Sequence, residues 1–267
     1  KESLKPGICD FQSKEILDAE CYFSESYWEA RAKFCHLAKA VGAEIHTHEV
    51  VEGDYTMDIA VLRGSGPGLV VHTSAVHGVE GYAGSGIQCA HLHKLVTEGQ
   101  TSGKFEGPTR LFVHAVNPYG MAHFRRFNEH NIDLNRNALS PEQFEEMKAR
   151  DHNLVMYEDF HNLFNPQYPP TFYDAYVGFF VKAVTSILRF GFVGVKRAVV
   201  TGQYHNPNGI YYGGAELEPS FQILWSYLEP YANTEGTVTW VDVHTGLGPK
   251  GEDTLIVDSP AEEAETI

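Results

Sequence analysis

The sequence is poor in basic residues. It has 20 Lys and Arg against 35 Asp and Glu, which gives a formal net charge of −15. This sign opposes binding to a phosphate backbone or to an anionic membrane surface, so we expect no nucleic-acid partner. The sequence also lacks a P-loop, and no glycine-rich dinucleotide fingerprint follows a predicted strand. The two commonest nucleotide-binding motifs are therefore missing.

The chain has only four cysteines, and none of them forms a CxxC pair. This spacing excludes zinc ribbons and thioredoxin-like redox motifs. A chain of this length buries enough surface to need no disulfide, so we expect free thiols in a reducing compartment, with two disulfides as the alternative. Residues 1–10 contain no apolar run of signal-peptide length. The compartment stays open, with the cytoplasm favoured.

Long apolar runs are also scarce. The longest, Val177 to Val195, has Lys182 and Arg189 within it. Cations inside such a run are costly in a bilayer, so we expect a helix that is buried or lies in a groove, and no membrane span.

The remaining sequence alternates between helical and strand-like patterns. With 43% apolar and 21% charged residues, and no visible linker, residues 1–267 are predicted to form a single domain. The alternation predicts an α/β fold with helices on both faces of a parallel or mixed sheet. Predicted strands are Glu44–Val51, Thr56–Arg63, Gly68–Thr73, Arg110–Val116 and Thr237–Val243. Predicted helices are Glu25–Val41, Gly84–Val96, Pro141–Phe164, Thr171–Arg189 and Pro219–Ala232.

Most of the 14 histidines lie in predicted helix or strand surfaces without a paired ligand spacing, but His77 is an exception. It follows the buried run 68–73, where a strand of an open α/β sheet would end, and such folds bind ligands there. Glu80 comes three residues later, between glycines. An imidazole and a carboxylate at this spacing can reach one point, and two His and one Glu with an open position form a catalytic zinc pattern.

His244 supplies a third ligand of the right kind. It ends the strand-like run TVTWVDV and enters a glycine-rich turn. Asp242 lies on the same side of that strand and could orient the imidazole through its second nitrogen. The alternative is that Asp242 and His244 only pair with each other across a loop.

A polar loop follows the predicted strand 110–116. It contains Arg125, Arg126, Asn135 and Arg136. Several arginines in one loop are either solvated or converge on an anion. Asn135 and Arg136 suit a bidentate carboxylate, and Arg126 could stabilise an oxyanion. A serine hydrolase based on Ser85 is a weaker hypothesis, because Ala83 stands where a nucleophile elbow needs glycine.

Taken together, the motifs HGVEG, NPYGM, RFNEHNIDLNRN and DVHTGLG occur in an order that resembles the M14-like zinc carboxypeptidase superfamily. The resemblance is strongest to the DUF2817 branch, which is related to aspartoacylase and succinylglutamate desuccinylase. It covers about residues 68–248 and implies a three-layer αβα sandwich around a mixed sheet.

The resemblance also implies roles. His77, Glu80 and His244 match the ligands of one zinc ion, Arg126 matches the residue that holds the oxyanion, and Asn135 and Arg136 match the pair that anchors a substrate carboxylate. Arg125 is the weaker candidate for the oxyanion role. The aromatic loop 204–212 is expected either to wall the pocket or to pack in the core or on the surface.

One element of the family pattern has no match. The general-base glutamate follows the third ligand at a distance, and the acidic residues after His244 lie too close to it; they are Glu252, Asp258, Glu262, Glu263 and Glu265. We therefore expect the domain to be C-terminally incomplete, with an exposed sheet edge near 254–257. Two hypotheses follow: a zinc hydrolase that cleaves an amide next to a free carboxylate in a small amide or peptide, or an inactive metal-binding scaffold for carboxylated ligands.

Overall fold

The chain folds around one mixed β-sheet. The structure, a computed structural model, describes residues 9–11, 13, 15–100, 105–154, 156–166, 168–169, 171–231, 235–246, 248–252 and 254. The sheet has the strand order β1-β2-β4-β3-β5. Its strands are β1 (Glu44–Val51), β2 (Tyr55–Leu62), β3 (Leu69–Thr73), β4 (Thr109–His114) and β5 (Val238–Asp242). The five predicted strands are therefore confirmed to within three residues at each end, and β1 has the predicted bounds.

The direction of the strands decides where ligands can meet. β1, β2 and β4 pair antiparallel, whereas β3 pairs parallel with both β4 and β5. The carboxyl ends of β3, β4 and β5 thus share one edge of the sheet. In the register, Thr73 at the end of β3 lies beside Asp242 at the end of β5. The segments that follow these two residues must therefore emerge side by side.

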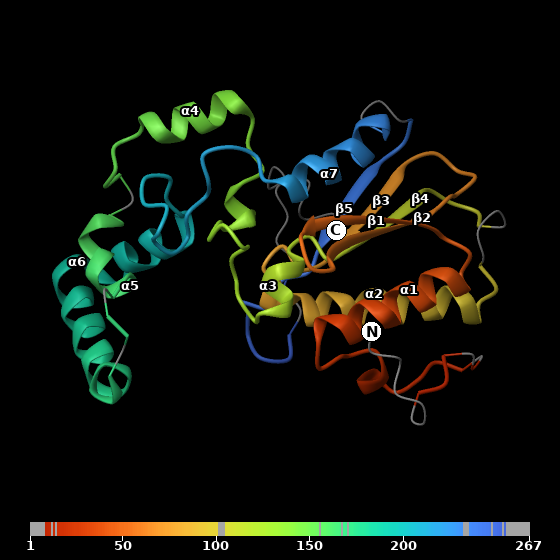
Figure 1. The fold of residues 1–267 in the computed structure, drawn as a ribbon, viewed down its shortest axis with the longest axis horizontal. Helices are drawn as coiled ribbons and strands as arrows, with labels where there is room; N and C mark the ends of the chain where they lie inside the picture. The colour runs from red at the N-terminus through yellow and green to blue at the C-terminus, as the bar shows by residue number, and fades with distance from the viewer. Residues whose placement is uncertain are drawn as a thin grey trace.

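Helices cover both faces of the sheet, as predicted. The helices α1 (Tyr27–Ala40) and α2 (Gly81–Thr97) lie against one face, and α7 (Pro219–Leu228) lies on the other (Figure 1). The local reasons for α1 are clear: the Ser26 hydroxyl accepts a hydrogen bond from the Glu29 N–H at 3.2 Å, and Gly42 follows the helix with φ +75°.

The two faces have separate apolar cores. The core between α1, α2 and the sheet includes Phe34, Leu92 and Phe112. The core on the α7 side includes Val71 and Leu224. Both faces of the sheet are thus covered by apolar packing.

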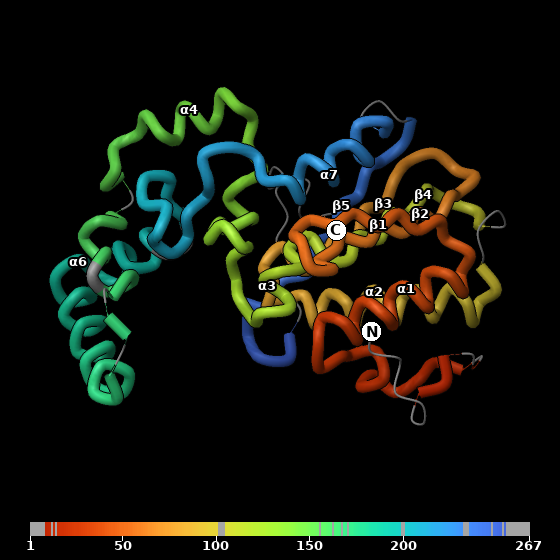
Figure 2. Tube along the Cα trace, in the orientation of Figure 1, coloured from red at the N-terminus to blue at the C-terminus, as the bar shows by residue number. Residues whose placement is uncertain are grey.

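Before it reaches α7, the chain leaves the sheet and forms a lobe beside it (Figure 2). A short helix, α3 (Pro118–Ala122), precedes the lobe. The lobe contains α4 (Pro141–Ala149), α5 (His161–Phe164) and α6 (Phe179–Thr201). The prediction of one helical stretch over 141–164 is wrong, because α4 ends at Ala149 and Met156 has a φ of +64°.

The expected burial of the run 177–195 is also wrong. Only 11% of the most apolar window of the helix Asp174–Ala198 is buried, and its mean hydropathy is 1.5. By length and composition this is the one helix of the described residues that could cross a membrane. Gly191 has non-helical dihedral angles (φ 77°, ψ 156°), so α6 consists of two arms.

The thiol prediction holds for two cysteines and fails for the other two. Cys35 and Cys89 are free, whereas Cys9 and Cys21 form a disulfide. This bond closes a short loop next to the α1–α2 core. A disulfide is typical of an oxidising compartment, so it counts against the reducing one that we expected.

Candidate metal centre

The segments after β3 and β5 bring the three predicted ligands together. His77 precedes a 3₁₀ turn, Gly78–Glu80, which leads into α2, and His244 comes two residues after β5 ends. One ligand atom from each of His77, Glu80 and His244 lies within 4.8 Å of the other two. The two imidazole centroids are 4.9 Å apart. Residues separated by more than 160 positions thus form one cluster.

Glu80 connects the two segments. Its Oε2 atom lies 3.1 Å from His244 Nδ1 and accepts a hydrogen bond from the Thr245 N–H at 2.9 Å. Burial alone would raise the pKa of Glu80, but the two hydrogen bonds and the neighbouring imidazoles of His77 and His244 together outweigh it and lower the pKa. Glu80 is therefore a carboxylate at neutral pH, as a metal ligand must be.

Asp242 holds the far side of the His244 ring. Its Oδ2 atom lies 2.8 Å from His244 Nε2, and its Oδ1 atom accepts a hydrogen bond from the Thr73 hydroxyl at 2.9 Å. The contact that we predicted from the spacing of Asp242 and His244 is present. With Nε2 held by Asp242, Nδ1 of His244 faces Glu80. A carboxylate that holds one ring nitrogen in this way orients the other nitrogen toward a metal.

His77 has a carboxylate of its own. Its Nδ1 atom lies 3.4 Å from Asp133 Oδ1, but the geometry of this contact is not that of a hydrogen bond, and Nδ1 is buried without a hydrogen-bond partner among the described residues. The Asn135 side-chain amide lies 3.4 Å from His77 Nε2. Each histidine of the cluster thus has an aspartate beside it, Asp133 for His77 and Asp242 for His244.

The two histidines differ in charge. Burial lowers the pKa of His77 to about 4, so this ring is neutral at pH 7. The hydrogen bonds to Asp242 and Glu80 raise the pKa of His244 to about 9, which makes this ring an imidazolium between two carboxylates. Because a metal ligand must be deprotonated, His244 would have to lose this proton to hold a cation.

Arg126 lies next to the cluster and shares Asp133 with His77. Its Nε atom donates to Asp133 Oδ2 at 3.0 Å, and its guanidinium carbon lies 5.5 Å from the centre of the Tyr211 ring. Tyr211 belongs to the aromatic loop 204–212, for which the sequence left a pocket wall and packing elsewhere as alternatives. Arg125 instead faces Tyr119, with its guanidinium carbon 5.9 Å from the ring centre.

Backbone contacts hold the polar loop that contains Arg125, Arg126, Asn135 and Arg136, here called the arginine loop, against the turn that follows His77. The Gly78 and Val79 N–H groups donate to the carbonyl oxygens of Arg126 and Arg125 at 3.3 and 2.9 Å. Gly78 has no room for a side chain, because a Cβ atom there would lie 2.2 Å from a backbone carbon of Gly120. This close approach explains a glycine directly after His77.

Asn135 and Arg136 form a short 3₁₀ turn, Leu134–Arg136, whose start is capped by the Asp133 side chain. The amide of Asn135 faces His77, as described above. The Arg136 guanidinium donates to the Asn135 carbonyl at 2.7 Å, and the Tyr204 hydroxyl donates to the Arg136 carbonyl at 2.6 Å. Asn135 therefore lies at the cluster, and Arg136 is one residue further along the same turn.

Asp133 is the residue that the sequence interpretation missed. It is fully buried and contacts His77, Arg126 and the Asn135 N–H. Its only signal in the sequence is that it precedes Leu134-Asn135-Arg136 in a loop, where an aspartate often caps a turn. The buried Asp133 carboxylate thus contacts both His77 and Arg126 and fixes their positions relative to each other.

Ser85, the weaker candidate nucleophile, lies in the core. It is 2% exposed on α2, and its hydroxyl lies 3.0 Å from Nε2 of the buried His114. A serine in this position is closed to substrate, which argues against a serine hydrolase.

A second polar cluster joins the arginine loop to the start of α7. Glu218 Oε2 lies 2.6 Å from the Asn128 amide and 2.8 Å from His130 Nδ1, and Glu129 completes a group with metal-ligating side chains. The hydrogen bond to Glu218 raises the pKa of His130. Glu218 already pairs with Asn128 and His130, so we interpret this cluster as a structural contact that ties the arginine loop to the start of α7.

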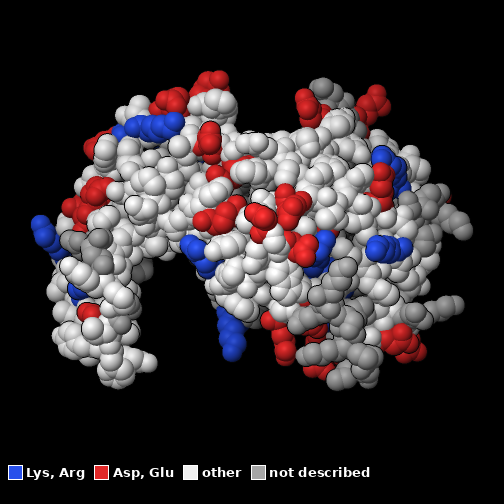
Figure 3. All heavy atoms as spheres, viewed as in Figure 1, with Lys and Arg blue, Asp and Glu red and all other residues white. Residues whose placement is uncertain are grey.

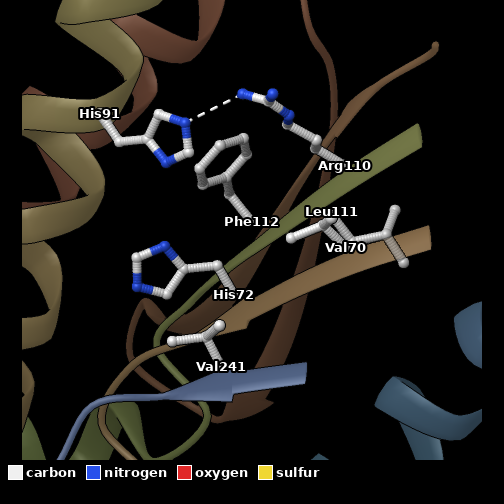
Figure 4. Close-up of a pocket in the computed structure, with 7 residues that line it drawn as sticks. All are labelled: Val70, His72, His91, Arg110, Leu111, Phe112 and Val241. Atoms are coloured by element: carbon white, nitrogen blue, oxygen red, sulfur yellow. Dashed lines mark hydrogen bonds between the residues drawn. The ribbon is translucent and has the colours of Figure 1, made fainter. Parts of the chain in front are cut away.

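A cavity of about 190 Å³ on the α2 face of the sheet contains two further histidines. Figure 4 shows His72 and His91 beside Phe112, with Arg110 reaching Nε2 of His91 at 2.9 Å. Burial lowers the pKa of His72 to about 4, and Nε2 of this ring is buried without a hydrogen-bond partner. No carboxylate lines this cavity, which distinguishes it from the His77 cluster.

Residues 23–267 match the family model described as "Protein of unknown function (DUF2817)". The chain belongs to the DUF2817 family. The match covers the His77–Glu80–His244 cluster and the arginine loop of this DUF2817 chain. No curated protein and no solved structure shows a significant match to it.

Proposed function

We propose that this DUF2817 chain is a zinc-dependent hydrolase of the carboxypeptidase type, which cleaves an amide bond next to a free carboxylate. The observation that carries the proposal is the convergence of His77, Glu80 and His244 within 4.8 Å at the carboxyl edge of the sheet. The order of the motifs along the chain supports a relation to the M14-like zinc carboxypeptidases.

The donor set fits zinc. Two imidazoles and one carboxylate, with a position left for water or substrate, are the ligands of many catalytic zinc sites. The buried Nδ1 of His77 and the aspartates beside both rings support this fit, because metal-binding histidines are usually paired with a carboxylate at the second nitrogen. Zinc held there would supply a Lewis acid that polarises a carbonyl oxygen and lowers the pKa of a bound water.

The arginine loop supplies the remaining groups. Arg126 is fixed by Asp133 next to His77, where its guanidinium can donate hydrogen bonds to an oxygen that becomes negative during amide cleavage. Asn135 and Arg136 offer an amide and a guanidinium for the free carboxylate of the substrate. The proposed substrates are therefore C-terminal peptide bonds or N-acyl amino acids.

The second candidate function is a metal-bearing scaffold that holds carboxylated ligands without turnover. The observation that favours it is the lack of an evident general base among the described residues. In this part of the chain, the carboxylates that the cluster contacts are Glu80, a candidate ligand, and Asp133 and Asp242, which lie against its two histidines.

The two candidates differ in turnover. The zinc-loaded protein is assayed with N-acyl amino acids and with short peptides, each compared with the same compound carrying a C-terminal amide. The hydrolase predicts that Arg126→Gln lowers kcat by about 10²–10³-fold. It predicts that Arg136→Gln mainly raises KM, because that residue contacts a group that does not react.

Arg125→Gln is the matched control, since it removes the neighbouring guanidinium and should leave both constants nearly unchanged. Cleavage that does not require the free carboxylate would refute the proposed substrate class. Binding of zinc and carboxylated ligands without any turnover would replace the hydrolase with the scaffold.

A further inference from the structure

The first arm of α6 exposes a large apolar surface at the tip of the lobe. Most apolar side chains of this arm are solvent-exposed, among them Phe180 at 61% and Leu188 at 81%, whereas Ala183, Ile187 and Phe190 are half-buried. The exposed aromatic residues Phe172, Tyr173 and Tyr176 precede it. Soluble monomers rarely expose a continuous apolar surface of this kind unless it contacts a partner or a membrane.

The polar residues of this arm form a single stripe. Lys182, Thr185, Ser186 and Arg189 fall within about 100° of arc on a helix of 3.6 residues per turn, and all other residues from 179 to 190 are apolar. The Thr185 hydroxyl is bonded to the Val181 and Lys182 carbonyl oxygens, which leaves the two cations as the outward charges of the stripe. The arm is a basic amphipathic helix.

The charge of this segment is opposite to that of the whole protein. Residues 175–215 contain Lys182, Arg189, Lys196 and Arg197 and no acidic residue, although the complete chain has a net charge of −15. All four cations are exposed. Figure 3 shows few acidic groups at the lower end of this lobe, in contrast to the acidic groups along its top and across the centre of the molecule. The sequence-based expectation from net charge therefore does not apply to this surface.

The shape of α6 favours lying on a membrane over crossing it. Gly191 ends the first arm with non-helical dihedral angles, and Lys182 and Arg189 are both within that arm. A cation is unfavourable at the centre of a bilayer, whereas at the interface the same side chain reaches the headgroups. A helix with Phe and Leu opposite a stripe of Lys and Arg is the form that binds in the interfacial plane.

We propose that the first arm of α6 docks this protein onto an anionic lipid surface, with Phe180 and Leu188 in the acyl boundary and Lys182 and Arg189 at the headgroups. Charge complementarity and apolar burial act together in this contact, and neither requires the metal centre. Two other occupants of this face are distinguished by the test below. A second copy of this chain would give a dimer, and an acidic protein partner would leave the arm without affinity for anionic vesicles.

The test is co-sedimentation of the purified full chain with vesicles. Vesicles of phosphatidylcholine alone are compared with vesicles that also contain phosphatidylserine, at about 0.1 M and about 1 M salt. We expect binding to the anionic vesicles at low salt, weaker binding at high salt, and little binding to phosphatidylcholine alone. Lys182→Glu/Arg189→Glu should weaken the binding by at least tenfold.

The matched control is Arg63→Glu/Lys94→Glu. It reverses two cations whose side chains are similarly exposed, at 64% and 63%, but which lie outside the lobe. We expect this variant to bind vesicles as the unaltered protein does. Leu188→Trp supplies a second readout, because its fluorescence should shift to shorter wavelength on anionic vesicles only if this face enters the membrane.

Three results would overturn the proposal. The first is an absence of sedimentation with anionic vesicles, and the second is equal weakening by both charge-reversed variants. The third is a dimer in sedimentation velocity that Leu188→Trp or the Lys182/Arg189 variant dissociates, because a second copy would then cover this face. Circular dichroism of each variant confirms that a loss of binding does not come from unfolding.

Discussion

Buried His114 should make the protein sensitive to acid. This residue ends β4, its Nε2 atom lies 3.0 Å from the Ser85 hydroxyl, and its ring stacks on Phe34 with 4.8 Å between centroids. The side chain is fully buried, and burial lowers its pKa from 6.5 to about 4. The folded protein therefore holds a neutral imidazole here at a pH where the unfolded chain is already protonated.

The size of the effect follows from this difference in pKa. Above pH 6.5, His114 is neutral in both the folded and the unfolded protein, so its titration costs no stability. As the pH drops from 6.5 to 4, the unfolding free energy falls because the unfolded chain binds the proton first. The loss attributable to His114 reaches about 2 kcal/mol at about pH 5 and about 3 kcal/mol below pH 4.

The assay is urea unfolding at about pH 7.5 and about pH 5, with the unaltered protein and His114→Phe. The substitution keeps an aromatic ring in the stack and removes the titration, so the change in unfolding free energy between the two pH values should shrink by about 2 kcal/mol. Other titrating groups are common to both proteins and cancel in this difference.

Phe34→Leu is the control. It disturbs the same stack and lowers stability at both pH values, but it leaves the imidazole in place, so the pH dependence should be that of the unaltered protein. If His114→Phe keeps the full pH dependence, the neutral buried imidazole is not the cause and the reasoning is refuted.

Three further predictions concern charges and the disulfide. Asp242→Asn should weaken zinc binding by about 10–100-fold in a chelator competition, because His244 loses its orienting carboxylate; an unchanged affinity would contradict this role. Arg31→Met removes the partner 2.6 Å from the fully buried Asp58 and should cost about 3 kcal/mol of unfolding free energy. Because the pKa of Asp58 is lowered in the folded state, the stability from this pair is present at neutral pH and lost as the pH falls through that pKa, so the cost should shrink in acid. Alkylation of the denatured protein without reductant should modify two cysteines, and all four after reduction; four without reductant would disprove the Cys9–Cys21 bond.

The sheet and its two helical layers could be predicted because their signals are local. The strand-like run 44–51 and the apolar run 69–73 lie between turn residues, and this pattern identifies strands without reference to the rest of the chain. The same logic placed His77 and His244 at strand ends. The two histidines meet because β3 and β5 are parallel neighbours in the sheet. No single motif predicts this pairing, and only the resemblance of the four ordered motifs to a known family implied that the histidines come together.

The features that were missed depend on contacts between distant residues. Asp133 is one of many polar residues in its loop, and only the folded chain places it between His77 and Arg126. The pairing of Cys9 with Cys21 is likewise not readable from spacing. The run 177–195 was expected to be buried because it is apolar, but hydropathy does not specify what covers a helix.

The most direct test of the metal centre is metal analysis of the purified protein after incubation with zinc and removal of the excess. The proposed function predicts about one zinc per chain, lost in His77→Ala and in His244→Ala and retained in His46→Ala, a histidine on β1 outside the cluster. Zinc that remains bound after either of the first two substitutions would contradict the assignment of His77, Glu80 and His244 as its ligands.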